Sequence, residues 1–262
     1  MPGRWTNIQE HAKRKELVEL YVKANKTIRE IAQELDLVES AVYDRLIRLD
    51  IPVRPWIKPR YNNKNPEIMV PKYSVDLAEF IGILLGDGHL TPTQVTVTLG
   101  TKEYEYAEYV ADLMERLFKV RPKIISSKRG DKVIYLGSTL LVKWFLKMGL
   151  AYNKVKSQVS TPQWCLNQRQ FIKAFLRGLT DTDGSVYRLS SGRLQISICN
   201  CSRPLLESSR IGFLKLGFHP SSISANKIYL TQKEDINKYY KEIGFSNIKH
   251  QQRFLKFNMG RW

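Results

Sequence analysis

The sequence is poor in cysteine and in long apolar runs, and both absences narrow the class of protein. Three cysteines, Cys165, Cys199 and Cys201, are too few for a disulfide framework, and with the four histidines they show no zinc-ligand spacing. The strongest apolar stretch, Phe80–Gly86, is far shorter than the ~20 residues that cross a bilayer. The N-terminal residues lack the apolar segment of a secretory signal. We therefore expect a cytoplasmic protein in a reducing compartment, with an organelle as the alternative, and no membrane partner.

Acidic residues are also scarce relative to basic ones. Lysine and arginine number 42 against 25 aspartates and glutamates, which gives a formal net charge of +17. A domain this basic usually binds a polyanion, and the lack of a membrane segment favours nucleic acid over an anionic membrane. With 43% apolar and 11% aromatic residues, the 262-residue chain can bury a core, so general disorder is excluded.

Residues 1–50 have the pattern of a small all-α domain. Thr27 is placed to cap a helix, with Glu30 completing a capping box, and a third helix begins near Glu39. The short turn between these helices, with the small Ala32 at their crossing, is typical of a helix-turn-helix. The alternative is a three-helix cap with a solvated charged face. The residues of the third helix expected to face outward, toward DNA, are Glu39, Ser40, Tyr43, Asp44, Arg45 and Arg48.

Residues 51–73 are predicted to be a basic linker. Several prolines and an asparagine cluster break regular structure there. Two interpretations stay open, an exposed connection and a segment that follows DNA phosphates. The basic residues that would contact phosphates are Arg54, Lys58, Arg60, Lys64 and Lys72.

Residues 74–165 and 166–262 are predicted to be two copies of one structural plan. LAEFIGILLGDGHL (77–90) and KAFLRGLTDTDGSV (173–186) are both apolar helical stretches that end in Asp-Gly. An alternating strand, a turn and an amphipathic helix follow in both copies. The expected fold is α+β, with two pseudo-symmetric αββαββα repeats behind the helix-turn-helix domain.

The two Asp-Gly pairs are the strongest functional signal. One copy alone would be a common helix stop, but an aspartate is locally unfavourable at a helix C-terminus, and here it recurs in both repeats. Gly82 and Gly178 would let the two helices pack backbone to backbone, which brings Asp87 and Asp183 side by side. Adjacent carboxylates in a basic protein favour divalent cations, and such a site suits phosphodiester hydrolysis.

FIGILLGDG and LRGLTDTDG resemble the two signature motifs of the LAGLIDADG homing endonucleases in their single-chain form. The resemblance covers about residues 75–255. It implies two antiparallel β-saddles that bind a long, nearly non-palindromic DNA site, and a monomer that makes a site-specific double-strand break. It also implies Mg²⁺ or Mn²⁺ at Asp87 and Asp183, beside the carbonyls of Gly86 and Thr182, with Ca²⁺ binding without supporting cleavage.

The resemblance implies further site residues, which are harder to assign. Asn200 resembles a polar residue that orients water; its counterpart in the first repeat, Leu99, cannot do this, and Gln94 is a weak substitute. A basic residue beside the scissile phosphate is usual in the family, and each candidate is equally a solvated or DNA-contacting lysine. The candidates are Lys154 and Lys249, then Lys156 and the more distant Lys233.

The predicted strands alternate in polarity, so one sheet face packs on helices and the other is available to DNA. The side chains expected to contact DNA from the sheets are Gln94, Thr96, Arg188, Arg193, Gln195 and Lys227.

Two further points concern the kind of gene product. The chain has no N-terminal Cys or Ser and no terminal His-Asn pair, so we expect an intron-encoded or free-standing protein rather than an intein. The alternative function is a catalytically weak DNA-binding regulator of this fold or an intron-splicing maturase. Loss of a motif acid would favour that alternative, and both acids are present.

Overall fold

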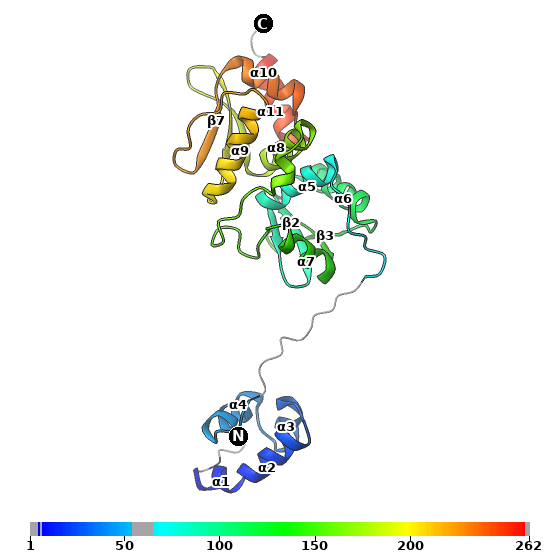
Figure 1. The fold of residues 1–262 in the computed structure, drawn as a ribbon, viewed down its shortest axis with the longest axis vertical. Coiled ribbons are helices and arrows are strands. Elements are labelled where there is room, and N and C mark those ends of the chain that lie inside the picture. The colour runs from blue at the N-terminus through cyan, green and yellow to red at the C-terminus, as the bar shows by residue number, and fades with distance from the viewer. Residues whose placement is uncertain (1–4, 6, 54–64, 260–262) are drawn as a thin grey trace. The chain divides into compact units, whose positions relative to one another are not determined.

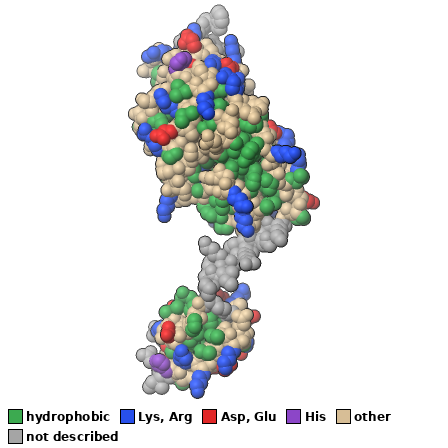
Figure 2. All heavy atoms as spheres, in the orientation of Figure 1, with side chains coloured by type: hydrophobic (Ala, Val, Ile, Leu, Met, Phe, Trp, Pro, Cys, Tyr) green, Lys and Arg blue, Asp and Glu red, His purple; other side chains and the backbone are tan. Residues whose placement is uncertain are grey.

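The computed structural model describes residues 5, 7–53 and 65–259, and the chain folds as two compact units, residues 1–60 and 61–262 (Figure 1). The predicted phosphate contacts Arg54, Lys58, Arg60 and Lys64 lie outside the described residues. Within the described ranges, no helix has the length and apolarity needed to cross a membrane. Lysine and arginine side chains are spread over the visible face of each unit (Figure 2).

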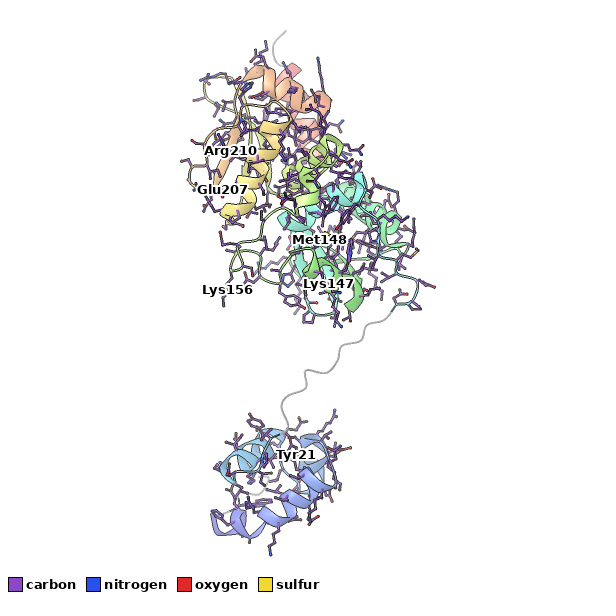
Figure 3. The ribbon with its side chains drawn as sticks, in the orientation of Figure 1. Tyr21, Lys147, Met148, Lys156, Glu207 and Arg210 are labelled. Carbon is purple, nitrogen blue, oxygen red and sulfur yellow. The ribbon has the colours of Figure 1, made fainter. Side chains whose placement is uncertain are left out.

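The smaller unit is all-helical. Thr27 caps α3, and the reciprocal bond from its backbone to Glu30 confirms the predicted capping box. Tyr21 is buried with Leu17 and Leu46 in a separate small core (Figure 3). The elements are α1 (Asn7–Ala12), α2 (Arg14–Val18), the π-helical turn η1 (Glu19–Lys23), α3 (Ile28–Glu34) and α4 (Glu39–Arg48).

The first repeat of the larger unit follows the predicted αββαββα order. Its four strands form one antiparallel sheet in the order β1-β2-β4-β3. The elements are α5 (Val75–Gly86), β1 (Gly88–Leu90), β2 (Gln94–Leu99), α6 (Tyr104–Phe118), β3 (Lys123–Ser126), β4 (Lys132–Gly137) and α7 (Thr139–Lys147).

The second repeat departs from the plan. Its sheet has the order β5-β6-β7, and the segment before β7 forms only the isolated bridge Ser224–Lys227. The Ser221 N–H donates to the Tyr229 carbonyl at 2.9 Å, but the Ser221 hydroxyl accepts the Tyr229 N–H in place of the Ser221 carbonyl, so a full ladder does not form. The elements are η2 (Gln163–Leu166), α8 (Arg169–Asp183), β5 (Gly184–Arg188), β6 (Leu194–Cys199), α9 (Arg203–Lys215), β7 (Lys227–Leu230), α10 (Lys233–Glu242) and an additional helix, α11 (Ile248–Met259).

The end of the expected linker packs on the larger unit. Ile68 is buried in its core, and the Met69 N–H donates to the Phe118 carbonyl at 3.1 Å. The Tyr73 ring stacks on Trp164 with the centroids 4.4 Å apart. Residues 65–73 are therefore part of the larger unit rather than part of an exposed linker.

Helices α5 and α8 cross with their backbones in direct contact. A Cβ on Gly82 would lie 2.7 Å from the Leu179 nitrogen, and one on Gly178 would lie 3.1 Å from the Ile83 nitrogen. Any side chain at these positions would meet backbone atoms, which cannot move aside as a side chain can. The predicted pairing of the two motif helices is therefore present, and it depends on two glycines.

We expect Gly82→Ala to lower the free energy of unfolding by about 1–3 kcal/mol, because the new methyl group forces the helices apart. Gly212→Ala in α9 is the matched control, since its Cβ would meet only side-chain carbons of Ile172, Leu166 and Leu176 at 3.2–3.6 Å. The control should change stability little, because alanine also favours the helix by about 1 kcal/mol. Urea denaturation of the two variants measures this, and equal effects would contradict the role of the crossing.

Candidate active site

The two motif aspartates lie at the neighbouring ends of the crossed helices. Asp87 directly follows α5, and Asp183 is the last residue of α8. A Cβ on Gly86 would lie 2.7 Å from the Thr182 Cβ and 3.1 Å from the Asp183 Oδ1, so the helices remain close up to their ends. The structure thus brings Asp87 and Asp183 together, with Gly86 and Thr182 beside them.

Both carboxylates are electrostatically strained. Burial, with the charges of Asp183 and Glu103 added, raises the pKa of Asp87 to about 6. Burial also raises the pKa of Asp183, against the opposing effects of the Asn200 hydrogen bond and the Lys154 charge. A neighbouring like charge in a partly desolvated place favours the neutral form of a carboxylate, as the charge of Asp183 does for Asp87. A cation at this point would relieve both.

Lys154 already places a cation at the end of α5. Its Nζ donates to the carbonyls of Leu84 (3.2 Å), Leu85 (2.9 Å) and Gly86. These carbonyls belong to the last turn of the helix, where backbone acceptors lack intrahelical partners and the helix dipole is negative. Burial lowers the pKa of Lys154, and the charges of the two aspartates oppose this shift. The ammonium therefore compensates both the helix end and the carboxylates.

Asn200 holds the Asp183 carboxylate. Its Nδ2 donates to the Asp183 Oδ2 at 2.5 Å, while its Oδ1 accepts from the Ser202 N–H at 2.7 Å. The strand pairs Gly88–Val97 and Gly184–Ile198 make Leu99 the counterpart of Asn200, and Leu99 is buried in the core. Gln94 begins β2, at the opposite end of the strand from Leu99, and pairs with Gly137. It is not brought to Asp87.

The polar side chains near Asp87 differ from those near Asp183. The Lys249 Nζ donates to the Glu103 Oε1 at 2.6 Å, and the Asn247 Nδ2 donates to the same oxygen at 2.8 Å. Burial works to raise the pKa of Glu103, but these bonds and one from the Gly100 N–H outweigh it and lower the pKa. Sequence comparison of the repeats missed Glu103, because the matching position in the second repeat is Pro204.

A buried polar network joins the two repeats beside the helix crossing. Glu79 of α5 is 1% exposed and pairs with Arg177 of α8. Its Oε1 also accepts from the Tyr109 hydroxyl and from the Ser246 hydroxyl, each at 2.6 Å. The Ser246 N–H donates to the Asp181 Oδ2 at 2.8 Å. The network fixes the segment that carries Asn247 and Lys249 into the site, and none of its members was predicted.

Two of the four candidate lysines are not at the site. Lys156 is exposed on the loop after α7, where Figure 3 labels it. Lys233 begins α10 and lines a separate cavity with Arg193. The two lysines at the site are Lys154 and Lys249, which occupy equivalent places after Gly149 and Gly244.

The expected outward face of α4 is only partly exposed. Ser40, Tyr43 and Arg48 are exposed, and the Arg48 Nη2 also pairs with Glu10 at 2.6 Å. Arg45 is 5% exposed, so the expectation that it faces outward is wrong. Its guanidinium stacks on the Trp5 ring at 4.5 Å and lies 3.3 Å from the Glu10 carboxylate, and these contacts hold it inside the unit.

Strand register places most of the predicted sheet residues on one face. Val95 and Val97 are buried, so Gln94 and Thr96 lie on the opposite face of β2. In the second sheet, Gln195 and Lys227 lie on the face opposite the buried Ile196 and Ile228. Arg193, two residues before Gln195, falls on the same face as Gln195. Arg188 differs, because it lies two residues after the buried Val186 and so on the same face as that residue, and its Nε donates to the Gly192 carbonyl at 3.0 Å.

The donor set at the helix ends fits a divalent cation that takes two carboxylates from the chain. Asp87 and Asp183 supply carboxylate oxygens, which Mg²⁺ and Ca²⁺ prefer, and the Lys154 ammonium shows that the α5 end accepts a cation. Over residues 5, 7–53 and 65–259, no group of three or more Asp, Glu, His or Cys is arranged to hold a metal. Any further ligands would be backbone carbonyls, water or a substrate phosphate.

Comparison with known proteins gives a family match within the second repeat. Residues 170–244 match the profile of the LAGLIDADG-like domain, which confirms the resemblance predicted from the motifs. Curated relatives include the replication factor C small subunit of Thermococcus kodakarensis, 25% identical over 77% of this chain and 24% of that protein. A second is the DNA polymerase of Thermococcus hydrothermalis, 29% identical over 55% of this chain and 9% of that protein. The chain therefore spans less than a quarter of the length of the curated relatives it matches.

Solved structures that are similar to this chain include those of I-DmoI and of WhiA. I-DmoI in complex with DNA and Mn has a TM-score of 0.47 and 19% identity, covering 66% of this chain and 97% of that one. The N-terminal LAGLIDADG domain of WhiA has a TM-score of 0.47 and 16% identity, covering 69% and 89%.

We expect Asp87→Asn to stabilise the folded chain at neutral pH. A pKa raised from 3.8 to about 6 means that folding opposes ionisation of Asp87, a penalty fully present above pH 6 and lost below pH 3.8. The variant should gain up to about 3 kcal/mol in unfolding free energy at pH 7.5 and about 1 kcal/mol at pH 4.5.

Urea denaturation at the two pH values measures this gain. Asp76→Asn is the matched control, because Asp76 lies in the first turn of the same helix, is exposed and pairs with Arg116. It should change stability by less than about 1 kcal/mol. Added Mg²⁺ should raise the stability of the unchanged chain and not that of Asp87→Asn. A loss of stability in Asp87→Asn at pH 7.5 would contradict the charge repulsion.

Proposed function

We propose that the chain is a site-specific, divalent-metal-dependent endonuclease that cuts both strands of DNA. The observation that carries the proposal is the meeting of two helix ends, one from each repeat, with a half-buried carboxylate on each. The net charge of +17 supports a polyanionic substrate. The match of residues 170–244 to the LAGLIDADG-like domain supports the same reaction class.

In this proposal Asp87 and Asp183 hold Mg²⁺ or Mn²⁺, with the backbone carbonyls of Gly86 and Thr182 beside them. When bound, the ion supplies positive charge that polarises the phosphodiester and stabilises the leaving oxygen. We propose that Ca²⁺ binds at the same oxygens without supporting cleavage. Protein side chains perform the remaining tasks.

We assign positioning roles to the polar residues around the acids. Asn200 keeps the Asp183 carboxylate in one orientation, and its amide is placed to orient a water molecule. Lys154 exchanges its helix carbonyls for a phosphate oxygen when DNA enters, since a phosphate is a stronger partner for an ammonium than a neutral carbonyl. On the other side, Glu103 holds Lys249 near Asp87.

We propose that the target is a long, nearly non-palindromic duplex bound by one copy of the chain. Both motif helices lie in one polypeptide, so a second copy is unnecessary. The two repeats differ in strand number and in the residues around each aspartate, which suits two different half-sites. Exposed polar side chains on the sheets and on α4 would contact the DNA, and an intron-encoded or free-standing gene remains our expectation.

Asp87→Asn and Asp183→Asn should each reduce double-strand cleavage by at least about 100-fold, because each removes a charge used only in the reaction. DNA affinity should change by less than a few-fold. The measurement is cleavage of a plasmid carrying the intron-free insertion locus of the gene, with and without Mg²⁺, beside a binding titration on the same DNA. Asp76→Asn should cleave normally. Binding without cleavage by the unchanged chain would instead favour the regulator or maturase alternative.

A chain that begins at Asn65 should still cut but bind more weakly. It retains Ile68 and Tyr73, which pack on the larger unit, and removes Ser40, Tyr43 and Arg48 of α4. Each lost phosphate contact should reduce the slope of log affinity against log salt by about 0.9. Footprinting and salt titration of both chain lengths measure the effect. Equal footprints and equal slopes would show that the smaller unit does not contact DNA.

A further inference from the structure

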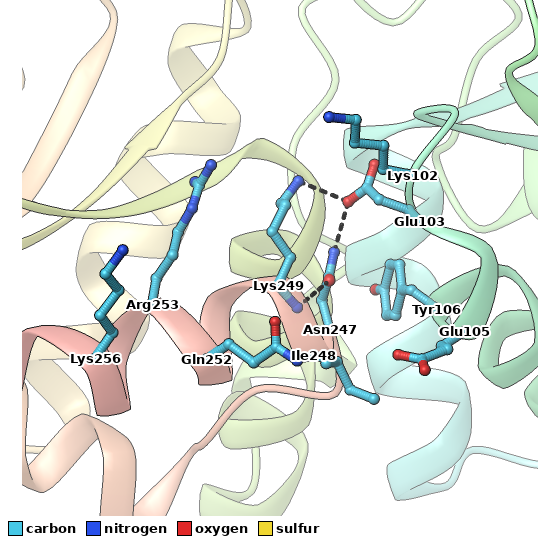
Figure 4. A pocket seen from close by; sticks show the side chains of 10 residues that line it. All are labelled: Lys102, Glu103, Glu105, Tyr106, Asn247, Ile248, Lys249, Gln252, Arg253 and Lys256. Carbon is cyan, nitrogen blue, oxygen red and sulfur yellow. Dashed lines mark hydrogen bonds and ion pairs between the residues drawn. The ribbon is translucent and has the colours of Figure 1, made fainter.

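One face of α11 carries a row of basic side chains that starts at the candidate active site. The basic residues of the row are Lys249, Arg253 and Lys256. Together with Gln252 they are spaced as residues on one helix face and line a cavity of about 430 Å³. The opposite wall is formed by Lys102 and the start of α6, as Figure 4 shows. Lys249 belongs to the row and to the Asp87 surroundings, so the row continues outward from the site.

Four basic side chains line the cavity against two acids, Glu103 and Glu105, so the lining keeps a net positive charge. Glu103 accepts hydrogen bonds from Lys249 and Asn247. Arg253, Lys256 and Lys102 are exposed, and no described acid forms an ion pair with any of them. The charges of Lys249 and Arg253 add to burial in lowering the pKa of His250 to about 4. The cavity therefore has a positive potential that an anion would relieve.

The row is held rigidly, as a binding surface needs to be. Phe254 is buried on the opposite side of α11 and stacks on Tyr240 with the ring centroids 4.1 Å apart. At the N-terminal end, the buried Asn247 donates to the carbonyl of Asp181 at 3.2 Å and to Glu103. The helix cannot rotate its basic face away from the cavity without breaking these contacts.

We propose that the basic face of α11 binds backbone phosphates of the DNA strand beside Asp87, next to the scissile phosphate. This inference rests on the proposed function. Seven residues separate Lys249 from Lys256, about 10 Å along the helix, which corresponds to about three nucleotide steps of ~3.4 Å on one strand. Arginine and lysine bind phosphates without reading base identity. The face therefore positions the duplex, while the sheets are left to read sequence.

The first test compares two double variants of the full chain. Arg253→Gln with Lys256→Gln removes two charges from the row. The matched control, Lys143→Gln with Lys147→Gln, removes two exposed and unpaired helical lysines from α7, where no salt bridge involves either among the described residues. Affinity for a 40-base-pair random duplex is measured by fluorescence anisotropy over a range of NaCl concentrations without divalent metal.

The α11 variant should lower the salt slope by about two, since each phosphate contact contributes about 0.9. The control should leave the slope unchanged. Equal slopes for the α11 variant and the unchanged chain, or equal changes in the two variants, would overturn the proposal. If the unchanged chain binds but cuts no target, the proposed function fails while the slopes still decide this inference.

A second measurement uses the unsubstituted protein, so folding of a variant does not enter. Lysine acetylation followed by mass spectrometry reports which amines the duplex covers. Lys102 and Lys256 should be protected at least about five-fold in the complex, as contacts to phosphates exclude the reagent. Lys143 and Lys147 should react as in the free chain. Unchanged acetylation of Lys256 in the complex would overturn the proposal.

Discussion

The direct contact between two helix backbones at Gly82 and Gly178 is the constraint on which the larger unit depends. Because no side chain separates α5 from α8 there, the helices stay close up to Gly86 and Thr182. Asp87 and Asp183 follow immediately, so they lie at neighbouring helix ends. The buried Glu79–Arg177 pair lies beside the crossing, and through Ser246 it also fixes the segment that leads to Lys249. One close approach therefore sets both the scaffold and the site.

The close approach of the two helices also brings negative charges together, and the fold compensates their repulsion only in part. Two half-buried carboxylates lie at neighbouring helix C-termini, where the dipole is also negative. Lys154 reduces the repulsion by lying across the α5 end, and Asn200 stabilises one carboxylate by a hydrogen bond. The remaining strain is why the pKa of Asp87 stays near 6. A local loss of folding stability of this kind is typical of a functional site, here one suited to binding a cation.

The two repeats have diverged most where they surround the acids. The first keeps four strands and places the apolar Leu99 where the second has Asn200, while Glu103 and Lys249 act near Asp87 instead. The second has a shorter sheet and the extra helix α11, whose basic face continues from the site. The scaffold is thus nearly symmetric, whereas its charge distribution is not. This difference supports our proposal that the target is a nearly non-palindromic duplex.

Features that depend on local order along the chain could be predicted from the residues alone. The capping box at Thr27, the αββαββα order of the first repeat and the paired glycines that let two helices cross all follow from spacing, because nearby residues decide them. Which distant side chains meet became visible in the folded chain. Folding buried Arg45 against Trp5 and Glu10, left Lys156 exposed and added Glu103 to the site. Contacts of this kind depend on strand register and on the direction of each side chain, which residue order does not fix.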